Sequence, residues 1–130
     1  MTILVGYVPT AQGEAAVTAA IAEAKAHGDS LLVVNMSRDD KLVDALRAES
    51  SDLGRIDEEL AESGVEHEVR RIEHGTDPAT QLLELAGSDG IRLLVIGLRH
   101  RTPVGKLLLG STAQRLLLEA PCAVLAVKAH

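Results

Sequence analysis

Residues 91–128 have the sequence IRLLVIGLRHRTPVGKLLLGSTAQRLLLEAPCAVLAVK, and the order of elements in this stretch decides the fold. It begins with an apolar run, Ile91–Gly97, and ends with another, Cys122–Lys128. Short runs that are apolar on both faces are typical of strands in a parallel sheet covered by helices. Between them, Ser111–Glu119 is predicted to be a helix. The stretch therefore predicts a strand, a long loop, a helix and a parallel strand.

The same alternation extends back to the N-terminus. Apolar runs predict strands at Thr2–Tyr7 and Ser30–Met36, and the alternating stretch Val65–His74 predicts a more exposed strand near a sheet edge. Apolar residues recur at helical spacing in three further segments. These segments are Ala11–His27, Ser37–Ser63 (as one long or broken helix) and Pro78 to about Ala86. We therefore expect one α/β domain, residues 1–130, with a mostly parallel five-stranded sheet and helices on both faces.

The composition narrows the classes of function. Hydrophobic residues make up 46% of the 130 residues, yet Tyr7 is the only aromatic one, so the core must consist of aliphatic side chains. The net charge of −6 argues against a protein that coats DNA or RNA, because phosphate backbones demand a basic surface. A small nucleotide stays possible, since it needs only a local positive site.

Neither a disulfide framework nor a targeting segment is indicated. Cys122 is the only cysteine, which excludes an intrachain disulfide, and we expect it to be a small core residue. The N-terminus lacks the basic start and apolar run of a signal peptide. No stretch approaches the roughly 18 uninterrupted apolar residues of a membrane span. We therefore expect a soluble cytoplasmic protein without a membrane partner.

Three features that favour anion binding coincide in Gly97–Thr112. Gly97 ends a strand, where a missing side chain would let a ligand approach the backbone. Gly110, Ser111 and Thr112 open a helix, whose unpaired N–H groups and dipole attract anions. The loop between them gathers the positive charge of Arg99, His100, Arg101 and Lys106. Together these features predict a phosphate-binding site.

An interpretation without a ligand fits the same residues. In it, Ser111 and Gln114 form a capping box, Gly110 supplies a positive φ angle, and the basic residues belong to a solvated loop. From the residues alone, both interpretations stay open.

Gly97, Gly110 and Ser111 have the spacing of the signature G-x2-G-x9-G-[ST], and the stretches ILVG, GTDPATQLLELA and EAPCAVLAV accompany it. In these motifs the chain resembles the universal stress protein family over essentially its whole length. The resemblance implies an adenine-nucleotide alpha-hydrolase-like fold with strand order 3-2-1-4-5. It also implies a crevice between the first and fourth strands, where ATP or AMP would bind, with Mg²⁺ entering only with ATP.

Two positions depart from the family pattern. His100 stands at the second glycine of the signature, where its side chain hinders a close backbone approach but, when protonated, would favour an anion. Val8 stands where nucleotide-binding members carry an aspartate after the first strand, so a contact to the nucleotide or to a divalent ion is lost. Met36 is expected either to line the adenine pocket or to be an ordinary core residue. The full set of expected binding residues is Val8, Pro9, Met36, Gly97, Arg99, His100, Gly110, Ser111 and Thr112.

No catalytic residue and no metal ligand is assigned. The chain has no G-x-G-x-x-G and no Walker A loop, since Leu107 follows Gly105-Lys106, and its histidines lack metal-binding spacing. We therefore expect a nucleotide-binding regulatory module of the stress response with little or no hydrolysis. The alternative is a stress-response interaction protein that has lost ATP binding. A nucleotide-hydrolysing enzyme is disfavoured, because no general base flanks the crevice.

A homodimer is the expected assembly. The strand Cys122–Lys128 would form an open sheet edge, and such an edge invites pairing with another strand unless something covers it. Pairing with its own copy gives a two-fold dimer, and members of the resembled family commonly dimerise through this strand. Alternatively, the tail Ala129-His130 and the neighbouring helices cover the edge.

Overall fold

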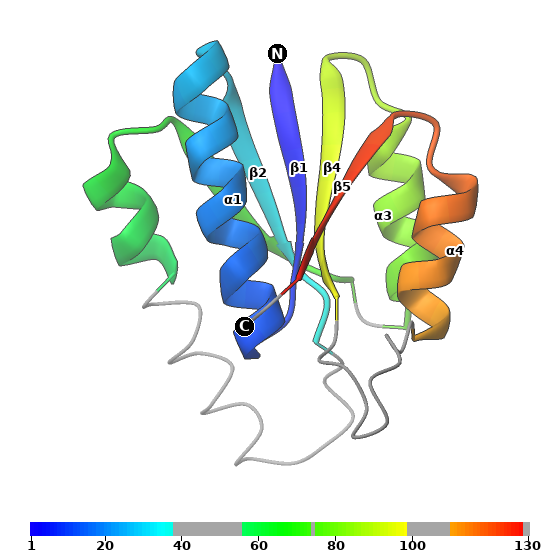
Figure 1. The fold of residues 1–130 in the computed structure, drawn as a ribbon. Coiled ribbons are helices and arrows are strands. Elements are labelled where there is room, and N and C mark those ends of the chain that lie inside the picture. Colours follow the sequence, from blue (N-terminus) through cyan, green and yellow to red (C-terminus); the bar gives the residue numbers. More distant parts are fainter. Residues whose placement is uncertain (38–55, 74, 99–109, 129–130) are drawn as a thin grey trace.

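The computed structural model describes residues 1–37, 56–73, 75–98 and 110–128. Its strands form one parallel sheet in the order β3-β2-β1-β4-β5, which confirms the predicted fold class and strand order (Figure 1). The bounds are β1 Thr2–Tyr7, β2 Ser30–Asn35, β3 His67–Arg71, β4 Ile91–Leu98 and β5 Ala123–Lys128. β3 is shorter than predicted and alternates half-buried with exposed residues, as befits an edge strand.

The helices begin and end at local capping signals. α1 spans Ala11–His27, because the Thr10 hydroxyl accepts a hydrogen bond from the Gly13 N–H (3.2 Å) and Gly28 ends the helix with a φ of +69°. α3 spans Pro78–Ala86 and α4 spans Ser111–Glu119. Residues 56–63 are also helical, whereas residues 38–55 of the predicted helix Ser37–Ser63 lie outside the described part of the chain.

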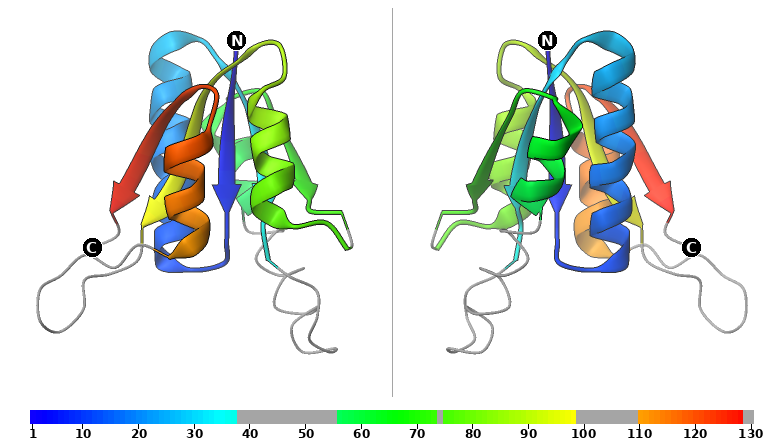
Figure 2. Two further views of the ribbon diagram at one scale, coloured as in Figure 1. Left: turned by 90° about the vertical axis from the view of Figure 1, so that its right-hand side faces the viewer. Right: turned by 90° about the vertical axis from the view of Figure 1, so that its left-hand side faces the viewer.

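Alternating residues of the sheet supply two aliphatic cores. Ile3, Val5 and Tyr7 of β1 face α1 and residues 56–63, whereas Leu4 faces α3 and α4. Figures 1 and 2 show these helices on opposite faces of the sheet. Because β1 and β2 are buried on both faces, the sheet is a rigid base from which the loops at its carboxyl ends project. None of the described helices has the length and apolarity needed to cross a bilayer.

Candidate functional site

A cleft of about 330 Å³ opens at the carboxyl ends of β1 and β4, at the lower end of the sheet in Figure 1. The chain leaves β1 for α1 on one face of the sheet and leaves β4 toward α4 on the other. The crevice at such a divergence is the usual ligand site of a doubly wound sheet. The volume lies at the lower end of the range for small-molecule pockets, about 300–1,000 Å³.

The structure brings together most of the residues predicted from the sequence. Val8, Met36, Gly97, Gly110, Ser111 and Thr112 all line the cleft. Pro9 lies in the exposed turn after β1 and is not part of the lining. Arg99 and His100 lie outside the described residues.

Other lining residues were not in the expected set of binding residues, although Thr10 and Leu98 belong to the two loops expected at the crevice, Val8–Thr10 and Leu98–Leu109. These other lining residues are Gly6, Thr10, Gln12, Pro78, Ile96, Leu98, Ala113 and Leu116. Ala113 and Leu116 could have been found from helical spacing, because Leu116 lies three residues after Ala113 and four after Thr112, on one face of α4. Gln12 and Pro78 lie in the first turns of two other helices, α1 and α3, and only the tertiary structure brings these helix starts to the same cleft.

Gly97 is needed for packing as well as for the shape of the cleft. A Cβ atom at this position would lie 2.0 Å from the Gln12 carbonyl oxygen and 2.5 Å from its carbonyl carbon. These are backbone atoms in the first turn of α1, so they cannot move aside as the end of a flexible side chain would. The absent side chain therefore lets α1 begin directly against β4.

The missing side chain of Gly6 lets Met36 and Leu82 pack directly against β1. A Cβ atom on Gly6 would lie 2.9 Å from both Met36 Sδ and Leu82 Cδ2. Met36 is 9% exposed and packs in the core cluster on the α3 and α4 face, yet it also lines the cleft. Met36 is thus a core residue that also borders the cleft, and its contact with an adenine stays a prediction.

The first turn of α4 has the geometry of an anion site. Gly110 is the N-cap residue, with φ −70° and ψ 161°, and no side chain provides a capping hydrogen bond in the described part of the chain. Ser111 is the first helical residue. Two of the three elements of the interpretation without a ligand are therefore wrong: Ser111 does not head a capping box, and Gly110 has no positive φ. The third, a solvated basic loop, concerns residues 99–109, which lie outside the described part of the chain. Helix-starting N–H groups without a capping side chain border the cleft, as an anion requires.

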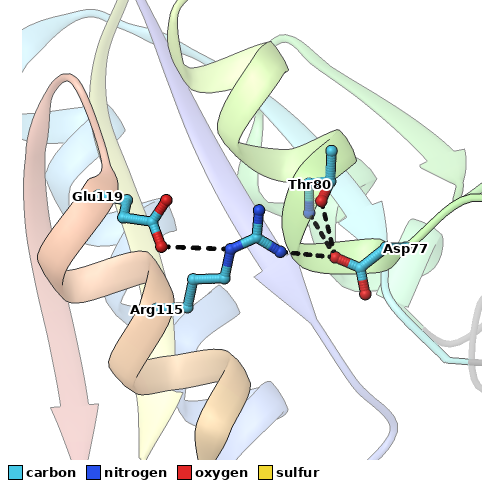
Figure 3. A network of polar contacts seen from close by, with 4 residues as sticks. All are labelled: Asp77, Thr80, Arg115 and Glu119. Atoms are coloured by element: carbon cyan, nitrogen blue, oxygen red, sulfur yellow. Dashed lines mark hydrogen bonds and ion pairs between the residues drawn. The ribbon is translucent and has the colours of Figure 1, made fainter.

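A polar network connects α3 and α4 beside the cleft (Figure 3). Asp77, the N-cap residue of α3, accepts hydrogen bonds at Oδ2 from the Thr80 N–H (3.0 Å) and the Thr80 hydroxyl (2.8 Å). The same oxygen lies 2.8 Å from an Arg115 nitrogen, and Arg115 Nε lies 3.3 Å from Glu119 Oε2. The network therefore joins the start of α3 to the middle of α4.

The hydrogen bonds from Thr80, and then the Arg115 guanidinium, lower the pKa of Asp77 below its usual value. Because folding lowers this pKa, the ionised carboxylate stabilises the fold at neutral pH. That contribution is lost only as the pH falls through the folded-state pKa. The ion pair is thus intact across the physiological range.

The described lining of the cleft is neutral. Its polar side chains are those of Thr10, Gln12, Ser111 and Thr112, and the rest are aliphatic residues, glycine, proline and Met36. Within residues 1–37, 56–73, 75–98 and 110–128, no group of three or more His, Cys, Asp or Glu side chains could hold a metal ion. The helix starts are therefore the source of positive potential in this lining, and of the three only α4 lacks a capping side chain among the described residues.

Comparison with known proteins gives consistent matches over the whole length. Residues 1–128 match the Universal stress protein family. A universal stress protein from Mycolicibacterium smegmatis is 50% identical over 128 residues, which is 98% of each chain. A universal stress protein structure from Archaeoglobus fulgidus superposes with a TM-score of 0.82 at 25% identity, covering 98% of both chains. Another from that organism, in complex with dAMP, has a TM-score of 0.76 at 21% identity, with the same coverage.

Proposed function

The chain belongs to the universal stress protein family, and we propose on that premise that its cleft binds an adenine nucleotide, AMP or ATP. The observation that carries the proposal is the start of α4, whose first turn borders the cleft without a capping side chain among the described residues. A phosphate there would accept hydrogen bonds from the N–H groups of the first turn. The dAMP complex of the Archaeoglobus fulgidus relative supports an adenine nucleotide as the occupant.

We propose that this protein is a cytoplasmic regulatory module of the stress response that hydrolyses ATP slowly or not at all. The described lining offers no carboxylate or imidazole to act as a general base. Val8 borders the cleft after β1, and its aliphatic side chain cannot ligate a metal ion as a carboxylate at this position would. Mg²⁺ would therefore enter only with ATP, held by the phosphates, and would not be required for AMP.

Val8 also favours a second candidate, a stress-response interaction protein that no longer binds nucleotides. An aliphatic side chain at the end of β1 offers no hydrogen bond to a ribose or a phosphate. In this case the cleft would remain empty, and the protein would act through its surface alone.

Analysis of the nucleotide content separates the two candidates. We expect protein purified without added nucleotide, then denatured, to release AMP or ATP detectable by mass spectrometry. Calorimetry on the nucleotide-free protein should show one AMP per chain, with an affinity that Mg²⁺ leaves unchanged. If no nucleotide is released, and no heat of binding is measured in millimolar AMP or ATP with Mg²⁺, the nucleotide-binding proposal is excluded. The second candidate, the interaction protein, would then remain.

We also propose that the protein is a homodimer paired through β5. This strand lies at the edge of the sheet, and its four central residues, Val124 to Val127, are only half-buried. A charged side chain on an edge strand blocks pairing with another strand. We therefore expect Val124→Lys to shift the mass measured by light scattering from dimer to monomer. Glu68→Lys on the opposite edge strand is the control and should remain dimeric. An unchanged mass for Val124→Lys would exclude this interface.

A further inference from the structure

α4 is held in place by few contacts, although its first turn forms a wall of the cleft. Leu116 is the only residue of α4 that is buried, and the helix packs against α3. Its outer face exposes Leu118, which is 78% accessible. Leu116 anchors α4 on the sheet, and the contact with α3 is a second attachment that can fix the orientation of the Ser111 turn.

We propose that Asp77 and Arg115 are positioning residues for the nucleotide, and that their ion pair fixes the first turn of α4 relative to the start of α3. The inference rests on the proposed function, because it concerns the same cleft. Pro78, which follows Asp77 directly, lines the cleft from the α3 side. The pair thus connects the two helices whose first residues line the cleft, while Asp77 and Arg115 themselves lie outside the lining.

The geometry suits a positioning role because other side chains fix the orientation of both Asp77 and Arg115. Two hydrogen bonds from Thr80 orient the Asp77 carboxylate, and Glu119 lies one turn beyond Arg115 and contacts its Nε (Figure 3). Arg115 is four residues after Ser111, so both lie on the same side of α4 and move together. A shift of α4 would break the 2.8 Å contact between Arg115 and Asp77.

The pair is too exposed to stabilise the whole fold strongly. The Arg115 and Asp77 side chains are 39% and 47% exposed, and ion pairs of this kind contribute little to overall stability. Their effect is therefore expected to be local, on the orientation of α4. This distinguishes a positioning role from a general structural one.

The described part of the chain contains another Asp–Arg ion pair, remote from the cleft. Arg92 Nε lies 2.6 Å from Asp29 Oδ2, and Asp29 also lies 3.3 Å from the N-terminal amine. Asp29 and Arg92 are at the amino ends of β2 and β4, and neither residue lines the cleft. Asp29 is 6% exposed, so Asp29→Asn removes a more buried carboxylate without touching α4, which makes it a stringent control for general loss of stability.

The first experiment measures AMP affinity by calorimetry. Asp77→Asn retains an N-cap acceptor for the Thr80 N–H but loses the charge, so it tests the ion pair without removing the cap. We expect Asp77→Asn and Arg115→Gln each to weaken AMP binding by about five-fold, and the double variant to weaken it by no more than either alone. Asp29→Asn should leave the affinity unchanged. Equal losses for Asp29→Asn and Asp77→Asn, or no loss for Asp77→Asn, would overturn the inference.

The second experiment needs no nucleotide. The Gln114 N–H donates to the Gly110 carbonyl (3.0 Å), so its hydrogen exchange reports on the first turn of α4. We expect faster exchange in Asp77→Asn and Arg115→Gln, but not in Asp29→Asn. If the wild-type protein binds neither AMP nor ATP, the proposed function fails, and the exchange rates alone decide the positioning role. Unchanged exchange in both α3–α4 variants would refute that role.

Discussion

Alanine at position 97 is expected to lower the free energy of unfolding by about 3 kcal/mol, and the melting temperature by about 10 °C. The added Cβ would lie 2.0 Å from the Gln12 carbonyl oxygen, so either α1 or the end of β4 must shift. Gln12 lines the cleft, and a site displaced in this way loses its geometry. We therefore also expect Gly97→Ala to weaken AMP binding by about ten-fold or more.

Thermal unfolding followed by circular dichroism, with calorimetry for AMP, measures both effects. Gly87→Ala is the matched control, because Gly87 has a φ of −84° and an added Cβ would have no described neighbour closer than 3.6 Å. It should unfold like the wild type and bind AMP equally well. A Gly97→Ala protein as stable as Gly87→Ala would show that the close approach of α1 to β4 is not required.

Aspartate at position 110 is expected to affect stability and binding in opposite directions. Gly110 has the extended conformation of an N-cap residue and provides no capping side chain, so an aspartate there would cap α4 and leave the melting temperature unchanged or slightly higher. Its carboxylate would occupy the place of the phosphate and repel it. We therefore expect Gly110→Asp to weaken AMP binding by about 100-fold or more.

Gly110→Asn separates the two causes of that loss. Asparagine caps a helix about as well as aspartate but carries no charge, so it competes for the N–H groups without repelling the phosphate. The expected order of AMP affinity is Gly110, then asparagine, then aspartate, with similar melting temperatures for all three. Equal affinities for the three proteins would mean that the start of α4 does not bind the phosphate.

Most of the elements were predictable because they depend on local signals. The bounds of α1 and α4 agree with those expected from spacing and from glycine positions, and Asp77-Pro78 correctly marked the start of α3. The strand order was not readable from periodicity, since hydrophobic alternation says which residues are buried but not which strand lies beside which. It came from the resemblance, and the observed pairing confirms it.

The backbone conformation of Gly110 shows that the capping-box motif is ambiguous in sequence. A Ser followed three residues later by a Gln predicts a capping box with Ser111 as the N-cap residue. In the structure Gly110 is the N-cap residue, and Ser111 is the first helical residue. The dihedral angles that distinguish these cases depend on how the preceding chain enters the helix. Sequence spacing alone cannot provide them.

The sequence by itself determined the family, the parallel α/β architecture and the cleft residues Gly97, Gly110, Ser111 and Thr112. Patterns of period two and 3.6, together with caps, act over a few residues and are therefore visible in a linear chain. The tertiary structure decided that Gln12, Met36 and Pro78 share one cleft, and that the Asp77 carboxylate meets Arg115. These relations depend on packing between segments far apart in the chain, where a few ångströms decide between a contact and a gap.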